Sequence, residues 1–238
     1  MIELKGKSIA IAGGSSGAGL AVAVQAAREG ATVHLIGRST ARLEKARLKV
    51  EGTVHTHALD IANEPDIAML RAEIGQLDHL VTTAADLTFK PLLELSNAEI
   101  DRMLASKFWG PIHLVRHFAP VLSMSGSITF VGGSAAYKAS AGASVVAAAN
   151  AALAGLARTL ALELAPVRVN VVSPGVFDGG TWDFLPAEVR SPTLREIGSG
   201  LPIGRVGTAE EVADAILFFV RNGFATGTVL PLDGGADA

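Results

Sequence analysis

Three glycines near the start of the chain have the spacing that backbone binding of a phosphate requires. Gly13, Gly17 and Gly19 form a G-x-x-x-G-x-G pattern between a short apolar segment, Ser8–Ala12, and a stretch of helical period, Leu20–Arg28. Glycine permits a tight turn and a close approach of the backbone, and a helix N-terminus attracts anions through its free N–H groups and its dipole. The pattern therefore predicts a dinucleotide-binding loop. Its expected contacts are Gly13, Ser15, Ser16, Gly17, Ala18 and Gly19.

A second position with a chemical consequence follows the next apolar segment, Thr32–Ile36. About 20 residues after the glycines, an NAD-binding unit usually carries a carboxylate that holds the ribose 2′-hydroxyl. This chain has Gly37 at that point, followed by Arg38 and Ser39. A guanidinium suits a 2′-phosphate, and the missing acid removes a repulsion. Arg38 and Ser39 therefore predict NADP(H) rather than NAD(H); the alternative is that Arg38 only caps a surface loop.

The elements that must position these residues alternate regularly along the chain. Short apolar runs, several of them apolar on consecutive residues as in a covered parallel sheet, are separated by longer segments of helical period. The expected strands are Ser8–Ala12, Thr32–Ile36, Thr53–His57, His79–Thr83, Ser127–Val131, Val167–Val172 and Gly227–Leu230. The alternation predicts an α/β protein with a Rossmann-like, doubly wound parallel sheet and helices on both faces.

Several helix starts can be read directly from the residue types. Ser96 with Glu99, and Thr208 with Glu211, have the spacing of a capping box. Asn63 precedes Glu64-Pro65, which places a cap before a proline in the first helical turn. No repeat, low-complexity linker or charge run marks a boundary, so residues 1–238 are interpreted as one dinucleotide-binding domain.

Composition excludes several other classes of function. The 238 residues carry a net charge of −3 and no cysteine, which removes disulfides, thiol nucleophiles and cysteine-based metal sites. The mild acidity and the lack of a Lys/Arg cluster give no reason to expect nucleic acid. Mean hydropathy is high, at +0.39, yet no window of about 18 uncharged, strongly apolar residues exists. We therefore expect a cytoplasmic protein without a membrane segment, and the first residues lack the apolar core of a signal peptide.

One segment is apolar on nearly every side. Residues Ala141–Ala165 contain little polarity before Arg158. A helix that is apolar all round needs burial all round, and the sheet can cover only one side of it. We therefore predict a homodimer or homotetramer that assembles through this helix, the alternative being cover by other helices of the same chain.

With these features, the chain resembles the short-chain dehydrogenase/reductase family over nearly its whole length. The matching features, taken together, are highly specific. They are the Ala12–Gly19 loop, Asp60-Ile61, Asp78–Val81, Gly126-Ser127-Ile128, Ala161-Leu162-Glu163-Leu164, Arg168-Val169-Asn170, Ser173-Pro174-Gly175, Pro202–Ala213 and Asp233-Gly234-Gly235. The resemblance implies a Rossmann-like fold, a nicotinamide cofactor, a small carbonyl or alcohol substrate, and dimers or tetramers packed through the long helices.

The resemblance also implies further cofactor contacts. Asp60 and Ile61 would contact the adenine, and Pro174-Gly175-Val176 would line the nicotinamide end of the site. The family's Asn-Asn-Ala-Gly stretch after the fourth strand is Thr82-Thr83-Ala84-Ala85 here, and Ala84 and Ala85 fall in the implied cofactor site. A threonine that often holds the carboxamide is replaced by Gly179, with Thr181 nearby.

The family's chemistry rests on a serine, a tyrosine, a lysine four residues after that tyrosine, and an asparagine on the preceding helix. The tyrosine is a general acid or base, the lysine lowers its pKa, and the serine holds the substrate oxygen. In this chain the serine position falls on Gly133 and the tyrosine position on Val146. The lysine position falls on Asn150, and Lys107 stands where the family has asparagine. The usual acid and its lysine are both missing.

No shift of register restores this pair. The only tyrosine, Tyr137, and the last lysine, Lys138, both precede the Ala141–Ala165 segment. One hypothesis is a rearranged site, in which the lysine and asparagine positions are exchanged and Ser134, Tyr137, Lys107 and Asn150 carry the chemistry. The other is a catalytically inactive NADP(H)-binding protein that acts as a sensor, regulator or partner subunit. A purely structural oligomer is disfavoured because structure alone does not require the glycine loop and Arg38.

Other candidate residues have weaker signals. His113 and His117 have a helical spacing that could grip a metal, but no carboxylate stands near them in the sequence; His55 and His57 share a strand face, expected at its exposed end. We therefore predict no metal site. Ser134 lacks the Gly-x-Ser-x-Gly surroundings of a hydrolase nucleophile. Apolar residues after Pro174-Gly175 suggest an apolar pocket or lid, or equally packing against a neighbouring element. They are Phe177, Trp182, Phe184 and Leu185.

Overall fold

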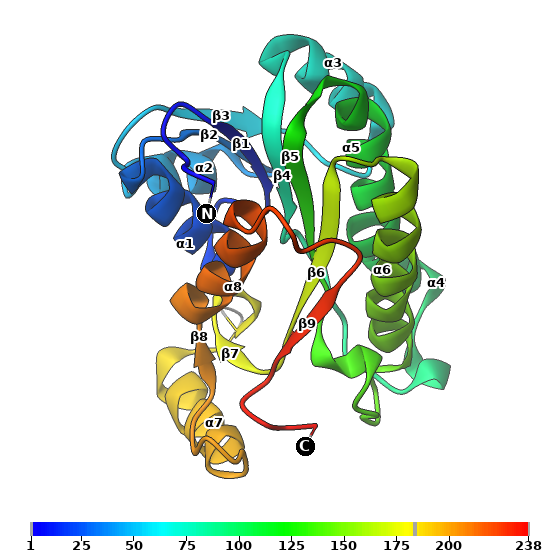
Figure 1. Cartoon of the computed structure of the whole chain (residues 1–238). Helices are drawn as coiled ribbons and strands as arrows, with labels where there is room; N and C mark the ends of the chain where they lie inside the picture. Colours follow the sequence, from blue (N-terminus) through cyan, green and yellow to red (C-terminus); the bar gives the residue numbers. More distant parts are fainter. Residues whose placement is uncertain (1, 183–184, 238) are drawn as a thin grey trace.

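Seven parallel strands form one sheet in the computed structural model, which describes residues 2–182 and 185–237. The strand order is β3-β2-β1-β4-β5-β6-β9 (Figure 1). The strands are β1 (Ser8–Ala12), β2 (Thr32–Gly37), β3 (Val54–Ala58), β4 (Leu77–Thr82), β5 (Leu122–Val131), β6 (Arg168–Pro174) and β9 (Val229–Leu232). All seven predicted strand segments are confirmed. β5 begins earlier than predicted, because an irregular register lets Leu122 pair with Leu77 ahead of the regular ladder.

Within the described ranges, eight α-helices connect and cover the strands. They are α1 (Gly17–Arg28), α2 (Thr40–Arg47), α3 (Glu64–Ile74), α4 (Asn97–Leu104), α5 (Gly110–Phe118), α6 (Ser144–Glu163), α7 (Ala187–Ser199) and α8 (Ala209–Arg221). Both predicted capping boxes, Ser96 with Glu99 and Thr208 with Glu211, are confirmed. Asn63 is the N-cap residue of α3 as predicted, but its side chain makes no capping hydrogen bond.

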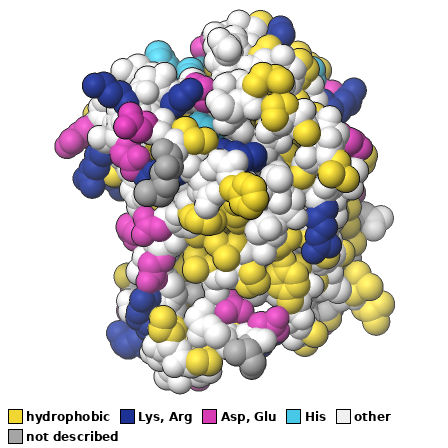
Figure 2. All heavy atoms as spheres, viewed as in Figure 1, with side chains coloured by type: hydrophobic (Ala, Val, Ile, Leu, Met, Phe, Trp, Pro, Cys, Tyr) yellow, Lys and Arg dark blue, Asp and Glu magenta, His cyan; other side chains and the backbone are white. Residues whose placement is uncertain are grey.

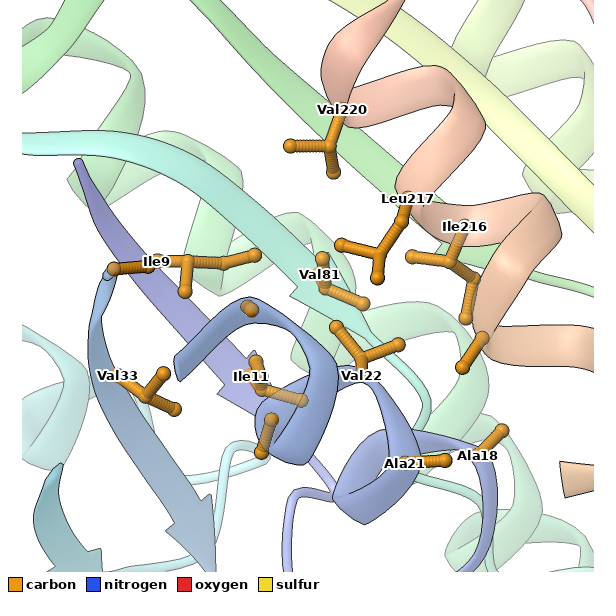
Figure 3. Close-up of a cluster of buried hydrophobic side chains, with 14 of the residues drawn as sticks. Ile9, Ile11, Ala18, Ala21, Val22, Val33, Val81, Ile216, Leu217 and Val220 are labelled. Carbon is orange, nitrogen blue, oxygen red and sulfur yellow. The ribbon is translucent and has the colours of Figure 1, made fainter. Parts of the chain in front are cut away.

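Alternate residues of the strands belong to two hydrophobic clusters, one on each face of the sheet. Ile9 and Ile11 of β1 pack with Val22 of α1 and Leu217 of α8 (Figure 3). Ala10 and Ala12 of β1 belong to the opposite cluster, which lies among α3, α5 and α6. Figure 1 shows α1, α2 and α8 on one side of the sheet and α3, α5 and α6 on the other. This is the doubly wound arrangement that the sequence predicted.

The long apolar helix α6 is buried along one side only. Leu153, Ala157 and Ala161 pack toward the sheet, whereas Leu162 is 81% exposed. An added Cβ at Gly155 would meet no atom within 4 Å, which places that residue on open surface. The expectation that the chain contains no apolar window of this length is corrected here: among the described residues, α6 is the one helix long and apolar enough to cross a membrane. A core helix of a soluble protein meets the same criterion.

The strand histidines are placed differently from the prediction. His55 is exposed, but His57 is buried, with its Nε2 atom 3.1 Å from Nδ1 of His34 on β2. Nδ1 of His57 lies 3.3 Å from the Glu73 carboxylate of α3. Burial lowers the pKa of His34 to about 4, which keeps it neutral. The expectation that His57 lies at an exposed strand end is therefore wrong, because α3 packs over that face; no metal-binding cluster occurs among the described residues.

Candidate active site

The glycine loop after β1 is packed so closely that two of its residues have no space for a side chain. Gly13 has φ +89°, and a Cβ there would lie 2.5 Å from Oγ1 of Thr83. A Cβ on Gly19 would lie 2.4 Å from the carbonyl oxygen of Gly13. The Thr83 hydroxyl donates to the carbonyl of Ala12 at 3.1 Å and so supports the turn. Thr83 appeared in the sequence analysis only in a predicted strand and in the Thr82-Thr83-Ala84-Ala85 stretch, with no role of its own, because this contact depends on β4 lying beside β1.

The N-terminus of α1 is left without a side-chain cap. Ser16 occupies the N-cap position, but it makes no capping hydrogen bond among the described residues. Its Oγ accepts a hydrogen bond from Nη2 of Arg42, at 3.0 Å, instead. A serine at the N-cap usually accepts a hydrogen bond from one of the first backbone N–H groups of its helix, but Ser16 does not. The first N–H groups of α1 are therefore available to an anion. Gly17 lies against Gly180, with 3.0 Å between the Gly180 nitrogen and a Cβ placed on Gly17.

Two arginines lie at the end of β2. Nη1 of Arg38 pairs with the Asp86 carboxylate at 2.9 Å. Ser39 caps α2, because its Oγ accepts from the backbone N–H of Arg42 at 3.4 Å. Arg42 was missed by the sequence reasoning, although it carried a signal: it stands in the first turn of a helix, where the helix dipole disfavours a cation. Asp86 was also missed, because only the adjacency of β1 and β4 brings it near Arg38.

The other residues expected to hold the cofactor lie at the carboxyl ends of β3, β4 and β6. Asp60 is exposed after β3, and its carboxylate accepts from the backbone N–H of Ala62 at 3.0 Å. Ile61 is buried against Gly110 of α5. Ala84 donates its backbone N–H to the Ala12 carbonyl at 3.0 Å. Gly175, between Pro174 and Val176, donates to the carbonyl of Leu232 at 2.9 Å. Ala85, the residue after Ala84, is exposed.

Lys107 is a buried cation whose side chain ends at the carboxyl end of β5. It lies on a π-helical turn, η2 (Ala105–Trp109), between α4 and α5, and is 4% exposed. Its Nζ atom donates to the carbonyls of Val131 and Gly132, at 2.7 and 3.0 Å. Burial lowers the pKa of Lys107 to about 8. An ammonium group with two carbonyl acceptors retains a third donor, and a pKa near neutrality lets it give up a proton.

Asn150 of α6 approaches the same β5 terminus from the next helix. A Cβ on Gly133 would lie 2.7 Å from Nδ2 of Asn150, so this position cannot carry a serine without displacing the amide. Oδ1 of Asn150 is buried and has no hydrogen-bond partner among the described residues. Lys107 and Asn150 therefore approach neighbouring residues: Lys107 through its hydrogen bond to the Gly132 carbonyl, and Asn150 through close packing of its amide on Gly133.

Ser134 and Tyr137 lie on the turn that follows this dipeptide. Ser134 begins the short helix η4 (Ser134–Ala136), and its carbonyl accepts from the backbone N–H of Tyr137 at 2.9 Å. Tyr137 is 43% exposed, and within the described residues its hydroxyl has no hydrogen-bond partner. Lys138 holds the same turn by donating from Nζ to the carbonyl of Ala236.

Comparison with known proteins decides the family. A protein-family model described as "Enoyl-(Acyl carrier protein) reductase" matches residues 12–237 of this chain. The chain is 33% identical to the short-chain dehydrogenase/reductase ATR9 of Stachybotrys chlorohalonatus, over 99% of both chains. It is 30% identical to the 3-oxoacyl-[acyl-carrier-protein] reductase FabG of Thermotoga maritima, covering 98% of this chain and 99% of that one. This chain belongs to the short-chain dehydrogenase/reductase family.

Solved structures of the family agree with the fold. A small-chain dehydrogenase in complex with NADPH superposes with a TM-score of 0.83 and 32% identity, over 98% of this chain and 99% of that one. The MalC reductase/Diels-Alderase of Malbranchea aurantiaca gives a TM-score of 0.89 and 28% identity, over 97% and 95%. The family relatives are oxidoreductases, so this chain is an oxidoreductase of the short-chain type with a Rossmann-like fold.

The segment after β6 is only partly open to a ligand. A Cβ on Gly179 would lie 2.3 Å from the Phe177 ring, and Phe177 packs on the hydrophobic cluster of α1 and α8. For Phe177 this packing favours the structural role over a lid. Trp182 and Leu185 are half-buried, so an apolar pocket stays a prediction there; Phe184 lies outside the described residues.

The paired histidines of α5 do have a carboxylate nearby in space. Glu64 of α3 lies 3.1 Å from Nε2 of His117 and 3.9 Å from Nε2 of His113. The same carboxylate pairs with Arg116 at 2.9 Å. Glu64 is remote from these histidines in sequence, and the packing of α3 on α5 brings it close. Its charge is already balanced by Arg116, so the cluster is a surface ion network.

Proposed function

We propose that this chain transfers hydride between NADP(H) and a small carbonyl or alcohol compound, using Ser134, Tyr137, Lys107 and Asn150. The observation that carries the proposal is the convergence of Lys107 and Asn150 on Gly132–Gly133. The resemblance expects a lysine and an asparagine on opposite sides of the site, and here each occupies the other's position. The site retains the amine and the amide, so it retains the groups that move and hold a proton.

The residues around the glycine loop fit a phosphorylated dinucleotide. The uncapped N-terminus of α1 offers N–H groups, and Gly13 and Gly19 leave the backbone free of side chains. Arg38 offers a guanidinium beside the end of β2, and no acid stands at Gly37 to repel a 2′-phosphate. When bound, NADPH would supply the hydride. The proposed preference for NADP(H) over NAD(H) is supported by Arg38 and by the structural similarity to a small-chain dehydrogenase solved in complex with NADPH.

The proton is assigned to the residues at the β5 terminus. In carbonyl reduction the substrate oxygen takes one proton while its carbon takes the hydride. Ser134 and Tyr137 offer hydroxyl groups to that oxygen. Lys107 is the buried source of the proton: its ammonium group becomes a neutral amine, which water then protonates again. Asn150 offers its amide to keep the donor and the oxygen in place.

Arg38→Gln tests the cofactor assignment. A hydrogen bond between charged groups contributes about 1.5–3 kcal/mol, so NADPH affinity is expected to fall roughly tenfold to a hundredfold. NADH affinity is expected to change less than twofold, because NADH has no 2′-phosphate. Fluorescence titration of both nucleotides measures this, followed by a hydride-transfer screen over ketones, aldehydes and quinones. Tight NADPH binding without turnover on any compound would contradict the enzymatic assignment and favour a binding protein.

We also propose that the chain assembles as a homodimer or homotetramer through the outer face of α6. Figure 2 shows hydrophobic side chains over the middle of this face, whereas charged ones lie mainly along its left margin and in places on its right side. On α6 itself, Leu162 is 81% exposed. Ala151 is exposed on α6, about one helical turn before Gly155, which also lies on open surface. Ala151→Arg would bury a charge at such an interface, at a cost of several kcal/mol. We expect sedimentation velocity to show a smaller species for this variant and no change for Gln76→Arg; an unchanged mass for Ala151→Arg would contradict the interface.

A further inference from the structure

Two polar bridges lie beside the glycine loop, where the proposed function places the adenosine end of the cofactor. The first joins Arg38, which directly follows β2, to Asp86, which comes shortly after β4. Since β2 and β4 flank β1 in the sheet, this ion pair crosses the carboxyl end of β1, where the glycine loop begins. The second bridge joins Arg42 in the first turn of α2 to Ser16 in the glycine loop. Both arginines thus come from the segment that follows β2, and Arg42 contacts the glycine loop directly.

The first bridge is weak enough to be replaced. The side chains of Arg38 and Asp86 are 62% and 31% exposed, and a single hydrogen bond of 2.9 Å joins them. Exposed ion pairs contribute little, because water solvates both charges. A phosphate dianion offers an arginine more charge and the geometry for two parallel hydrogen bonds. It can therefore take Arg38 from Asp86.

The second bridge leaves a cation without an anion. Arg42 donates to a neutral hydroxyl, and among the described residues no carboxylate pairs with it. Arg47, one turn later on the same helix, is paired with Glu44 at 3.0 Å. Arg42 also stands at the positive end of the α2 dipole, which is unfavourable for a cation unless an anion balances it. Ser16 is diverted from capping α1 to hold this guanidinium over the loop.

We propose that the 2′-phosphate of NADP(H) binds by exchange: it displaces Asp86 from Arg38 and takes Arg42 as its second guanidinium. Arg42 is then a specificity-determining residue, and Asp86 is the internal anion that occupies the site in the free protein. The inference rests on the proposed function, because it needs a nicotinamide cofactor in this cleft. It adds two residues that the sequence patterns did not identify, and it predicts that they act in opposite directions.

Arg42→Gln tests the first half of the exchange with ligands that lack nicotinamide. Adenosine 2′,5′-bisphosphate carries the 2′-phosphate, and adenosine 5′-monophosphate does not. We expect calorimetry to show about tenfold weaker binding of the bisphosphate and less than a twofold change for the monophosphate. Lys45→Gln removes a charge from the same helix and is the matched control, expected to have little effect. Equal losses for both probes, or no loss for either, would overturn the role of Arg42.

Asp86→Asn tests the second half. Removing the competing carboxylate is expected to tighten binding of the bisphosphate about two- to fivefold, the range that an exposed ion pair allows. The same substitution is made in an Arg38→Gln background to separate competition from simple repulsion. If Asp86 acts by occupying Arg38, the tightening disappears in that background. Tightening that persists there would overturn the exchange, and so would unchanged affinity in the single variant.

These outcomes distinguish the two levels of the argument. If the unmodified protein binds neither NADPH nor the bisphosphate, the cofactor assignment fails and the exchange fails with it. If it binds NADPH but the Arg42 and Asp86 variants show unchanged selectivity for the 2′-phosphate, only the exchange fails.

Discussion

Lys107→Met is expected to lower kcat for carbonyl reduction about a hundredfold or more, the contribution of a positioned general acid. Methionine has a similar length and fills the buried space, but it cannot donate to the carbonyls of Val131 and Gly132. NADPH affinity and melting temperature are measured beside steady-state rates, so that a loss of folding is recognised. Lys49→Met, at an exposed lysine, is the control and should leave kcat unchanged.

The pH profile gives Lys107 a signature that a structural role does not have. Burial sets its pKa at about 8, so the ammonium that donates a proton is present below pH 8 and is lost as the pH rises through that value. Reduction should therefore slow above pH 8, whereas alcohol oxidation, which needs the neutral amine as a base, should become faster. Both limbs should vanish in Lys107→Met. If Tyr137→Phe and Lys107→Met each leave turnover intact, the rearranged site is wrong.

Gly13→Ala is expected to abolish measurable NADPH binding and to lower the melting temperature by roughly 5–15 °C. The added methyl group would lie 2.5 Å from the Thr83 hydroxyl and 2.6 Å from the Ala84 nitrogen, in a backbone conformation with φ +89°. Strain of this backbone and overpacking each cost about 1–3 kcal/mol, and in a chain of this size each kcal/mol corresponds to a few degrees. Calorimetric melting and nucleotide titration measure the two effects.

Gly223→Ala is the matched control for that substitution. Its backbone is not left-handed, and the nearest atom to an added Cβ is 3.9 Å away. We expect a change in unfolding free energy within about 0.5 kcal/mol, as at an ordinary surface position. If Gly13→Ala and Gly223→Ala lost the same unfolding free energy, the close packing around Gly13 would not be the cause of the loss.

The fold was accessible from local signals because they agree with one another. Short apolar strands, capping boxes such as Thr208 with Glu211, and the glycine pattern each predicted their own element, and the structure confirms them. A covered parallel strand is apolar on both faces wherever it occurs, so its identity does not depend on its neighbours. The errors were at positions such as His57, whose exposure depends on the packing of α3.

The site was less accessible, because its pairs are distant in sequence. Lys107 and Asn150 could be named as candidates by their positions, but their approach to the neighbouring residues Gly132 and Gly133 depends on tertiary packing. The helical segments that precede and follow β5 in the chain pack at the same end of that strand. The structure also explains why glycine stands at the position that the resemblance assigns to serine: the Asn150 amide fills the space of its side chain. Neither residue type alone reveals that coupling.

The sequence by itself determined the class of fold and the glycine turn between β1 and α1, and it predicted which residues could move a proton. These follow from residue type and short spacing, which act within one turn or one strand. Only the tertiary structure decided that Asp86 holds Arg38, that Arg42 reaches Ser16, and that the amine of Lys107 is buried with a pKa near neutrality. Such contacts and desolvation arise from segments brought together across the sheet, and no local pattern in the chain encodes them.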